Sequence, residues 1–305
     1  ARLIIHRYAM LGVLDERGFP LREMGVLEAP RTGDAPALQA DAGSLSYGQL
    51  DTRSAQLAAE LRACGLQAGM PVGLCMPRSA EAVVAMLGIL RAGGVIVPLD
   101  PAWPPARRQF VTSDAGAQIV LTDLCPQLPD GGLKAAGLLP AGAAVLLYTS
   151  GSTGGPKGAV TTHASAVNRC HWMWQDYAFG AQDLFVLRTS FGFIDSLWEI
   201  FGALSHGIPL VIAPDDIATD ALRLPEFLRE RSVTHLVLVP SLLRALLDAL
   251  SEGGAPEGGL PALRSCISSG EPLDPELARR FRAAFPAARL LNTWGTSEVW
   301  DASCH

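Results

Sequence analysis

Stretches with apolar residues at helical spacing alternate along the chain with short runs that are apolar throughout. One helical stretch runs from Leu45 to Gly65 and ends on a glycine, as many helices do. A second covers residues 80–92 and ends at the pair Gly93–Gly94. The apolar runs V-G-L-C-M and V-I-V-P-L-D follow these stretches and predict buried strands.

The alternation continues toward the end of the sequence. Further apolar runs read A-Q-I-V-L-T-D, A-A-V-L-L-Y-T-S, P-L-V-I-A, T-H-L-V-L-V-P, C-I-S-S-G and R-L-L-N-T-W-G. Continuous apolar strands separated by helices indicate parallel sheets covered on both faces, and ligands bind beyond the carboxyl ends of such strands. We therefore predict an α/β fold of two mostly parallel β-sheet subdomains flanked by helices, with functional residues directly after strands.

Breaks in the pattern divide the chain into three parts. Residues 1–40 have weak periodicity and several turn formers, so we expect an extended leader, with at most one short helix and no chemistry. Residues 41–165 are predicted to form a first α/β subdomain and residues 166–305 a second. The chain has 305 residues, 49% of them hydrophobic, which is enough to bury a core in more than one α/β unit.

Composition and charge narrow the class of partner. A formal net charge of −6 provides no basic stripe for phosphodiesters, so we expect small molecules and no nucleic acid. The six cysteines form no C-x-x-C pair, which argues against a zinc site or a disulfide framework and favours the reducing cytoplasm. No apolar stretch reaches about 18 residues, so we expect neither a membrane span nor a signal peptide.

One segment at 148–158, Y-T-S-G-S-T-G-G-P-K-G, combines glycines, hydroxyls and a lysine after an apolar strand. Its glycines let backbone amides converge on an anion, while the hydroxyls and Lys157 add donors and charge. We interpret the segment as a phosphate cradle, and the alternative is a flexible Gly/Ser hairpin. It is no Walker loop, because proline precedes Lys157 and Gly158 follows it. Gly154 comes one residue too late for the G-x-S-x-G elbow of hydrolases.

Four further segments accompany this loop in a fixed order. They are L-S-Y-G-Q-L at 45–50, L-R-A-G-G-V-I-V-P-L-D at 90–100, D-S-L-W-E-I-F at 195–201 and N-T-W-G-T-S-E at 292–298. Together the five segments resemble the adenylate-forming enzymes, which include acyl-CoA synthetases, luciferases and the adenylation domains of nonribosomal peptide synthetases. The proline-ended form of the 90–100 segment favours the peptide synthetases.

The resemblance implies ATP-dependent activation of a carboxylic acid as an acyl adenylate, with transfer to the phosphopantetheine thiol of a carrier protein. ATP and Mg²⁺ would be the cofactors. Lys157, Ser297 and Glu298 would be catalytic, with Ser297 on the α-phosphate and Glu298 on Mg²⁺. Trp294 stands where tyrosine is commoner and would stack on adenine, although such a residue often belongs to the core. By resemblance, the ATP-binding residues are Thr149, Ser150, Gly151, Ser152, Thr153, Gly154, Lys157, Gly158, Gly270, Asn292, Trp294 and Ser297.

The substrate pocket departs from the usual pattern of this family. Amino-acid domains commonly carry F-D-x-S-x-W-E, whose aspartate pairs with the α-ammonium of the substrate. Here Ile194 stands at the aspartate position and Asp195 follows one residue later. An apolar Ile194 cannot offset the desolvation of an ammonium, whereas a displaced Asp195 suits an amine one carbon further from the carboxylate. The carried-over pocket positions are Phe193, Ile194, Asp195, Trp198, Val237, Ile267, Ser269, Thr293, Asp301 and Ala302.

These positions are similar to the selectivity pattern associated with β-alanine. We therefore predict a small β-amino acid, with Trp198 as the pocket floor, and Asp301 as a second ammonium partner for a diamino or other polar substrate. Two alternatives stay open for Asp195. It could be the N-cap of the following helix. The substrate could also lack an amine, as α-keto, α-hydroxy and aryl acids do.

The family implies parts that this sequence does not contain. Domains of this type continue into a ribose-binding aspartate, a hinge and a lid with a catalytic lysine, whereas this sequence ends at His305. We expect a truncated N-terminal core with the lid absent, incomplete as a stand-alone catalyst, whose partners are the carrier protein and neighbouring synthetase domains or the missing lid. The alternative from another class is a non-catalytic nucleotide-binding or docking module, against which Lys157 and Glu298 argue.

Overall fold

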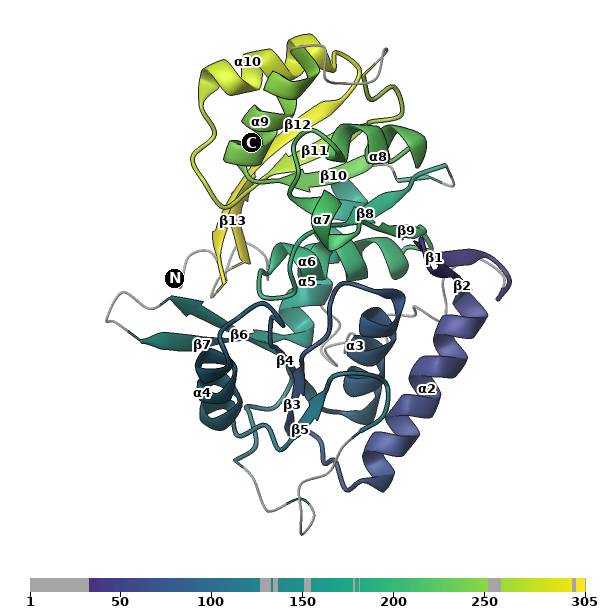
Figure 1. Cartoon of the computed structure of the whole chain (residues 1–305), viewed down its shortest axis with the longest axis vertical. Helices are drawn as coiled ribbons and strands as arrows, with labels where there is room; N and C mark the ends of the chain where they lie inside the picture. Colours follow the sequence, from purple (N-terminus) through teal and green to yellow (C-terminus); the bar gives the residue numbers. More distant parts are fainter. Residues whose placement is uncertain are drawn as a thin grey trace.

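The structure is a computed structural model, which describes residues 33–126, 133, 137–150, 155–177, 179–180, 182–251, 259–297 and 300–304. It contains two β-sheets, the larger above the smaller in Figure 1, with helices packed against both. Most neighbouring strands are parallel, and each sheet carries antiparallel partners at its margins. The predicted fold class, two mostly parallel sheets flanked by helices, is confirmed.

The smaller sheet uses residues from the first half of the chain. Its order is β5-β3-β4-β6-β7, with β6 and β7 forming an antiparallel hairpin. Apolar side chains of α2 and α3 pack on one face and those of α4 on the other. The elements are α2 (Tyr47–Ala63), β3 (Pro71–Leu74), α3 (Ala80–Ala92), β4 (Val95–Pro98), α4 (Pro105–Ala115), β5 (Ile119–Leu121), β6 (Ala143–Ser150) and β7 (Pro156–Thr162).

The larger sheet has the order β13-β12-β11-β10-β8-β9-β1-β2. Strands β12 to β1 run parallel, while β13 and β2 are antiparallel to their neighbours. Its strands are β1 (Pro36–Ala40), β2 (Gly43–Ser46), β8 (Phe185–Leu187), β9 (Leu210–Ile212), β10 (His235–Leu238), β11 (Ser265–Ser268), β12 (Arg289–Thr296) and β13 (Trp300–Cys304). The helices of this half are α5 (His163–Asp176), α6 (Asp195–Leu197), η1 (Trp198–Gly202), α7 (Asp215–Ala218), α8 (Leu224–Glu230), α9 (Pro240–Ser251) and α10 (Pro275–Ala284).

Local sequence signals explain where the central helix α3 begins and ends. The Ser79 side chain accepts a hydrogen bond from the Ala82 N–H and caps the first turn. Gly93 ends the helix with a φ of 89°, a left-handed conformation that glycine adopts without steric cost. The predicted bounds of 80–92 are therefore confirmed.

The two faces of the larger sheet belong to different hydrophobic clusters. Val237 and Ile267 point to the cluster that contains Trp198 and continues into the smaller sheet. Leu236 and Cys266 point to a second cluster built with α8, α9 and α10. Alternation along each strand thus turns one face toward the junction of the two sheets.

The predicted domain boundaries are wrong near the start of the described chain. Residues 36–40, expected in the leader, form β1, and residues 43–46, expected in the first subdomain, form β2 of the larger sheet. Leu38 is fully buried and pairs in register with Leu210 of β9. The strand is short and begins at Pro36, and its partners are the adjacent strand β2 and the distant strand β9, which the local sequence does not indicate.

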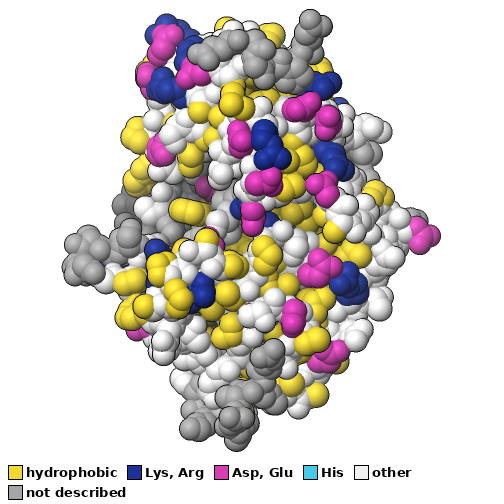
Figure 2. All heavy atoms as spheres, viewed as in Figure 1, with side chains coloured by type: hydrophobic (Ala, Val, Ile, Leu, Met, Phe, Trp, Pro, Cys, Tyr) yellow, Lys and Arg dark blue, Asp and Glu magenta, His cyan; other side chains and the backbone are white. Residues whose placement is uncertain are grey.

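Charged side chains of both signs are mixed on the face shown in Figure 2, without a broad area of one sign. Across the described ranges, the helices are too short or too polar to cross a bilayer.

Candidate functional site

Polar residues gather where the parallel strands of the larger sheet end. Ser268 of β11 lies opposite Asn292 of β12, so Ser269–Gly270 and Asn292–Thr293 are neighbours at this edge. The carboxyl edge of a parallel sheet is where α/β folds bind ligands. The structure therefore brings together sequence positions that lie more than twenty residues apart, as the pattern of residues after strands predicted.

The predicted acid-pocket residues from three strands share one face of the sheet. Val237 lies directly opposite Ile267 in the strand register, and both belong to the cluster around Trp198. Ser269 and Thr293, each two residues beyond a member of this row, are buried. The Thr293 hydroxyl has no hydrogen-bond partner within the described part of the chain. A buried hydroxyl of this kind is suited to meet a polar group of a ligand.

Trp198 closes this face from the side of η1. The side chain is 1% exposed, and with Val237 and Ile267 it lines a cavity of about 10 Å³, large enough for one water molecule. Phe185 packs edge-on against the indole, with the ring centroids 5.8 Å apart. Apolar side chains therefore fill the base of this face.

Three candidate substrate-binding residues precede Trp198, and their side chains differ in exposure to solvent. Phe193 is 66% exposed, whereas Ile194 packs against the core cluster and Asp195 is half-buried. Ile194 has helical backbone angles and precedes α6, and Asp195 is its first residue. The interpretation of Asp195 as an N-cap is therefore wrong, because Ile194 occupies the N-cap position and Asp195 is the first residue of α6.

The proposed phosphate segment forms the tip of the β6–β7 hairpin. Thr149 pairs with Lys157 and Ser150 with Pro156, so the segment is not one continuous turn from residue 148 to 158. Lys157 is exposed on β7, and a Cβ on Gly158 would lie 2.8 Å from Leu146 Cδ1, so a larger residue there would require the Leu146 side chain to shift. The alternative interpretation of this segment as a hairpin is correct for strands β6 and β7. Phosphate binding by the segment stays a prediction. The predicted positions Gly151, Ser152, Thr153 and Gly154, and the side chain of Ser150, lie outside what the structure describes.

The predicted adenine residues lie at the same edge, with Asn292 and Trp294 on β12 and Gly270 directly after β11. Trp294 is 63% exposed, so the interpretation of this residue as plain core is wrong. Asn292 is half-buried, and Gly270 is exposed with a φ of 84°. Ser297 is half-buried in the turn that follows β12. Glu298 lies outside the described residues, as do the side chains of Asp301 and Ala302, whose backbone belongs to β13.

Two buried charged residues, Glu199 of η1 and Arg188 directly after β8, lie near the carboxyl edge of the larger sheet. The sequence pattern did not indicate a role for either of them. Glu199 is 1% exposed and accepts hydrogen bonds from the N–H of Arg188 and from the N–H and hydroxyl of Thr189. Burial raises the pKa of Glu199 to about 7, while Arg188 and the Thr189 donors oppose the shift. The sequence signal was a single acidic residue inside the apolar run L-W-E-I-F.

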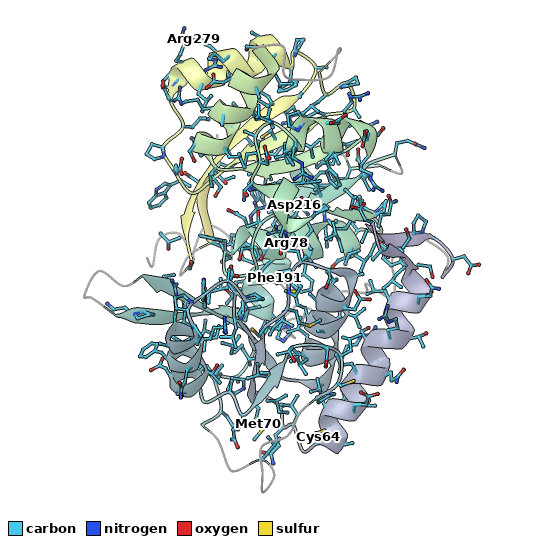
Figure 3. The ribbon with its side chains drawn as sticks, in the orientation of Figure 1. Cys64, Met70, Arg78, Phe191, Asp216 and Arg279 are labelled. Carbon is cyan, nitrogen blue, oxygen red and sulfur yellow. The ribbon has the colours of Figure 1, made fainter. Side chains whose placement is uncertain are left out.

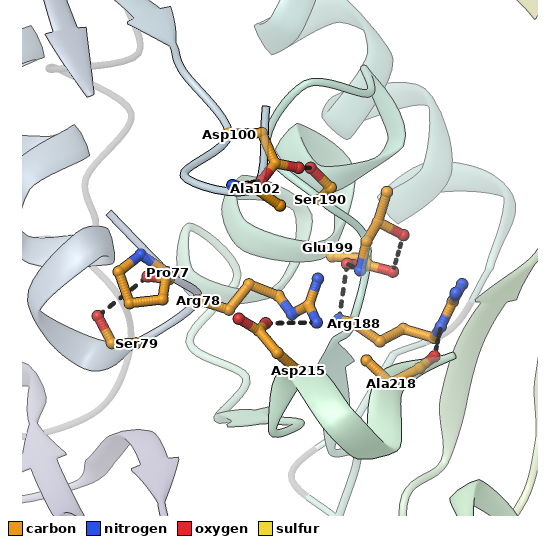
Figure 4. Close-up of polar contacts among 11 residues, drawn as sticks. Pro77, Arg78, Ser79, Asp100, Ala102, Arg188, Ser190, Glu199, Asp215 and Ala218 are labelled. Atoms are coloured by element: carbon orange, nitrogen blue, oxygen red, sulfur yellow. Dashed lines mark hydrogen bonds and ion pairs between the residues drawn. The ribbon is translucent and has the colours of Figure 1, made fainter. Parts of the chain in front are cut away.

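Polar contacts join the two sheets beside this pair (Figure 4). Arg78, which precedes α3, places a guanidinium nitrogen 2.6 Å from Asp215 Oδ1 of α7. The Ser190 hydroxyl lies 3.2 Å from Asp100 Oδ2, which follows β4. Arg78 and Phe191 lie at the level where the two halves of the molecule meet (Figure 3). The candidate site therefore lies along a junction to which both sheets contribute.

Comparison with known proteins identifies the family. The sequence profile described as "AMP-binding enzyme" matches residues 27–141 and 133–305. The chain belongs to the AMP-binding enzyme family. The suspected resemblance to adenylation domains of nonribosomal peptide synthetases is thereby confirmed for the portion of the fold present here.

Curated relatives of this AMP-binding enzyme are much longer proteins. The chain is 36% identical over 295 residues to phosphinothricin tripeptide synthetase PhsB of Streptomyces viridochromogenes, covering 89% of this chain and 24% of the relative. It is 35% identical over 279 residues to syringomycin synthase SyrB1 of Pseudomonas syringae, covering 85% and 45%. With AMB antimetabolite synthetase AmbB of Pseudomonas aeruginosa it shares 37% over 290 residues, covering 89% and 22%. The chain thus spans less than half the length of each.

Solved structures share the fold over nearly all of the chain. The AMPPNP-bound form of the nonribosomal peptide synthetase FmoA3 superposes with a TM-score of 0.83 at 29% identity, covering 96% of this chain and 33% of that one. VinN superposes with a TM-score of 0.80 at 24% identity, covering 94% and 77%, and this likeness concerns the fold alone.

Proposed function

We propose that this AMP-binding enzyme activates a carboxylic acid with ATP as part of nonribosomal peptide or hybrid polyketide biosynthesis. Family membership and the synthetase names of the relatives support this proposal. In the proposed reaction a carboxylate oxygen of the acid attacks the α-phosphorus of ATP. A new oxygen–phosphorus bond forms, the bond to the β-phosphate bridge breaks, and pyrophosphate leaves.

The residues present fit a nucleotide at the sheet edge. Trp294 offers an exposed aromatic face beside half-buried Asn292. A Cβ added to Gly270 would lie no closer than 3.5 Å to Val239, so the surface beside it is open. FmoA3, whose fold this chain shares, was solved with AMPPNP, which supports an adenine nucleotide here.

Charge neutralisation is the main contribution that the chain would make to the reaction. Lys157 would face the β- and γ-phosphates from the hairpin, and Ser297 would donate a hydrogen bond to the α-phosphate. Glu298 would hold Mg²⁺, whose chemistry is to neutralise phosphate charge. The acyl product would pass to the thiol of a carrier protein's phosphopantetheine arm.

The substrate that we propose is a small β-amino acid of the β-alanine type. The observation that carries this proposal is the position of Asp195, which is half-buried as the first residue of α6, with Ile194 at the N-cap. A carboxylate there can neutralise an ammonium displaced by one carbon, while Ile194 cannot. Trp198, 1% exposed beneath the pocket face, leaves room for a short chain.

Two other functions compete with this proposal. An α-keto, α-hydroxy or aryl acid would need no carboxylate partner, and the apolar Ile194 favours such a substrate. A non-catalytic nucleotide-binding or docking module would retain the edge residues without turnover. In the docking case the carrier protein and neighbouring synthetase domains would be binding partners only.

Hydroxylamine trapping separates catalysis from docking. The full-length protein, meaning this chain together with the C-terminal lid that the family implies, is incubated with ATP, Mg²⁺, hydroxylamine and one acid at a time, and the acyl hydroxamate is measured by mass spectrometry. We expect β-alanyl hydroxamate that depends on ATP. Hydroxamate formation only from keto, hydroxy or aryl acids would support the second function, and no hydroxamate from any acid would support docking.

A further inference from the structure

Glu199 holds the backbone that leads to the acid pocket. Its Oε2 lies 3.1 Å from the Arg188 nitrogen and 2.9 Å from the Thr189 nitrogen, and its Oε1 lies 2.7 Å from the Thr189 hydroxyl. These donors all belong to the turn directly after β8, at the carboxyl edge of the larger sheet, and Figure 4 shows Glu199 beside Arg188. A buried carboxylate with several charge-assisted hydrogen bonds fixes the donors that it binds.

The turn held by Glu199 is one end of the segment that carries the substrate residues. The segment runs from Arg188 through Ser190 to Asp195, and Glu199 follows in the same helical stretch formed by α6 and η1. Within it, the Phe193 N–H donates to the Ser190 carbonyl at 3.0 Å. Both ends of the segment are therefore attached to one short helical stretch, which limits how far Asp195 can move relative to the sheet.

Arg188 extends this connection to the opposite wall of the pocket. Its Nη1 donates to the Val237 carbonyl at 2.8 Å, and its Nε donates to the Ala218 carbonyl at 3.0 Å. Burial lowers the pKa of Arg188, while the Glu199 and Asp195 carboxylates oppose that shift, which places Asp195 within electrostatic reach of the guanidinium. One buried pair thus connects Asp195, the turn after β8 and the Val237 wall.

We propose that Glu199 is a positioning residue for the acid substrate, holding the segment that carries Asp195 in register with the Val237 wall through the Arg188–Thr189 turn. This inference rests on the proposed acid activation and concerns the same pocket. Glu199 touches neither the acid nor ATP in this account. Its removal should therefore weaken acid binding and leave nucleotide binding unchanged.

The charge state of Glu199 provides a readout that a purely structural role would not give. Its ionised form can accept from all of these donors, whereas a proton would occupy one acceptor site. Burial raises its pKa to about 7. The charged or titratable groups nearby are Arg188, with Arg78 and Asp195 next to it, and His235, which lines the same small cavity. The KM for the acid should therefore rise as the pH falls through 7.

The test is ATP–pyrophosphate exchange by the full-length protein with β-alanine, comparing wild type with Glu199→Gln. We expect the KM for β-alanine to rise about tenfold, as expected for weakened charge-assisted hydrogen bonds, with the KM for ATP unchanged. The rise of acid KM at low pH should disappear in this variant. Thr189→Val removes only the hydroxyl donor and should raise the acid KM less, in the same direction.

Ser54→Ala is the matched control for lost stability. Ser54 is fully buried in α2, packed on the smaller sheet, and its hydroxyl donates to the Leu50 carbonyl at 2.7 Å, away from the Arg188–Thr189 turn and the small cavity. Its KM values should stay at the wild-type level. An unchanged acid KM in Glu199→Gln, or equal rises for acid and ATP in both variants, would overturn the positioning role. A wild-type protein without exchange for any acid would instead overturn the proposed function itself, and the inference with it.

Discussion

The indole of Trp198 lies against Gly202 one turn later in η1, where an added Cβ would come within 2.3 Å of its Cε3 atom. This contact explains the glycine, because any side chain would occupy the volume of the indole. The Gly202 carbonyl also accepts a hydrogen bond from Trp174 Nε1 at 2.9 Å, which holds the Gly202 backbone from a second side. The floor of the pocket is therefore set by backbone packing as well as by Trp198 itself.

Gly202→Ala should displace Trp198 and disturb the pocket. We expect the free energy of unfolding to fall by about 1–3 kcal/mol, the usual cost of overpacking a core, with a higher KM for β-alanine. Denaturant unfolding and pyrophosphate exchange measure the two effects. Gly137→Ala is the control, because a Cβ there meets nothing within 4 Å. Wild-type stability in Gly202→Ala would show that the indole has room to move.

Trp294→Ala should weaken ATP binding without affecting the fold. Its ring is 63% exposed, so little core packing is lost, whereas base stacking contributes about 1–3 kcal/mol. The KM for ATP should therefore rise about tenfold or more, with an unchanged unfolding midpoint. Phe110→Ala, which removes another exposed aromatic ring on α4, should leave the KM for ATP at the wild-type value. Equal changes in the KM for ATP in the two variants would show that Trp294 does not contact the nucleotide.

Asp195→Asn should discriminate between substrates that have an amine and those that lack one. The substitution keeps the shape of the side chain and removes the charge that we propose for the substrate ammonium. Because Asp195 is half-buried, we expect kcat/KM for β-alanine to fall about tenfold or more. Activity with an α-keto acid, measured in the same exchange assay, should not fall. Equal losses for both acids would mean that Asp195 stabilises the fold and does not select the amine.

Asp183→Asn should lower stability in a pH-dependent way. Burial alone would raise the pKa of Asp183, but hydrogen bonds from His235 and the Gly180 N–H, with Arg264 nearby, hold it below its usual value. The stabilisation is present above the unfolded pKa of about 3.9 and is lost as the pH falls through the folded value.

Breaking this buried pair should cost about 3 kcal/mol at pH 7, measured by denaturant unfolding. The difference between Asp183→Asn and wild type should narrow below about pH 4. Asp274→Asn is the control, since Asp274 caps α10 from an exposed position and asparagine caps equally well. A difference that stays constant down to pH 2–3 would contradict the role of the charge.

Elements with strong local signals could be predicted from the sequence. The capping serine and terminal glycine determine the bounds of α3, and long apolar runs mark β6 and β10. The position of Ser269, Asn292 and Thr293 at one edge follows from the rule for parallel sheets, because each comes at or near the end of an apolar strand.

Elements that depend on distant partners could not be predicted. Strand β8 has only the residues Phe185–Leu187 and is stabilised by β9 and β10 on either side. Strand β1 similarly needs β9, far along the chain. The N-cap position of Ile194 was missed because an aspartate before S-L-W is a good N-cap by composition, whereas the backbone is already helical at Ile194. The hydrogen bonds that Arg188 and Thr189 donate to Glu199 could not be predicted either, because neither helical nor strand periodicity relates these residues.

Pyrophosphate exchange across a panel of acids tests the central claim most directly. The panel for the full-length protein contains β-alanine, α-alanine, a larger β-amino acid, an α-hydroxy acid and an α-keto acid, each at several concentrations. Our account predicts the highest kcat/KM for β-alanine and a lower value for α-alanine. Preference for the keto or hydroxy acid would contradict the assignment of Asp195 as the ammonium partner.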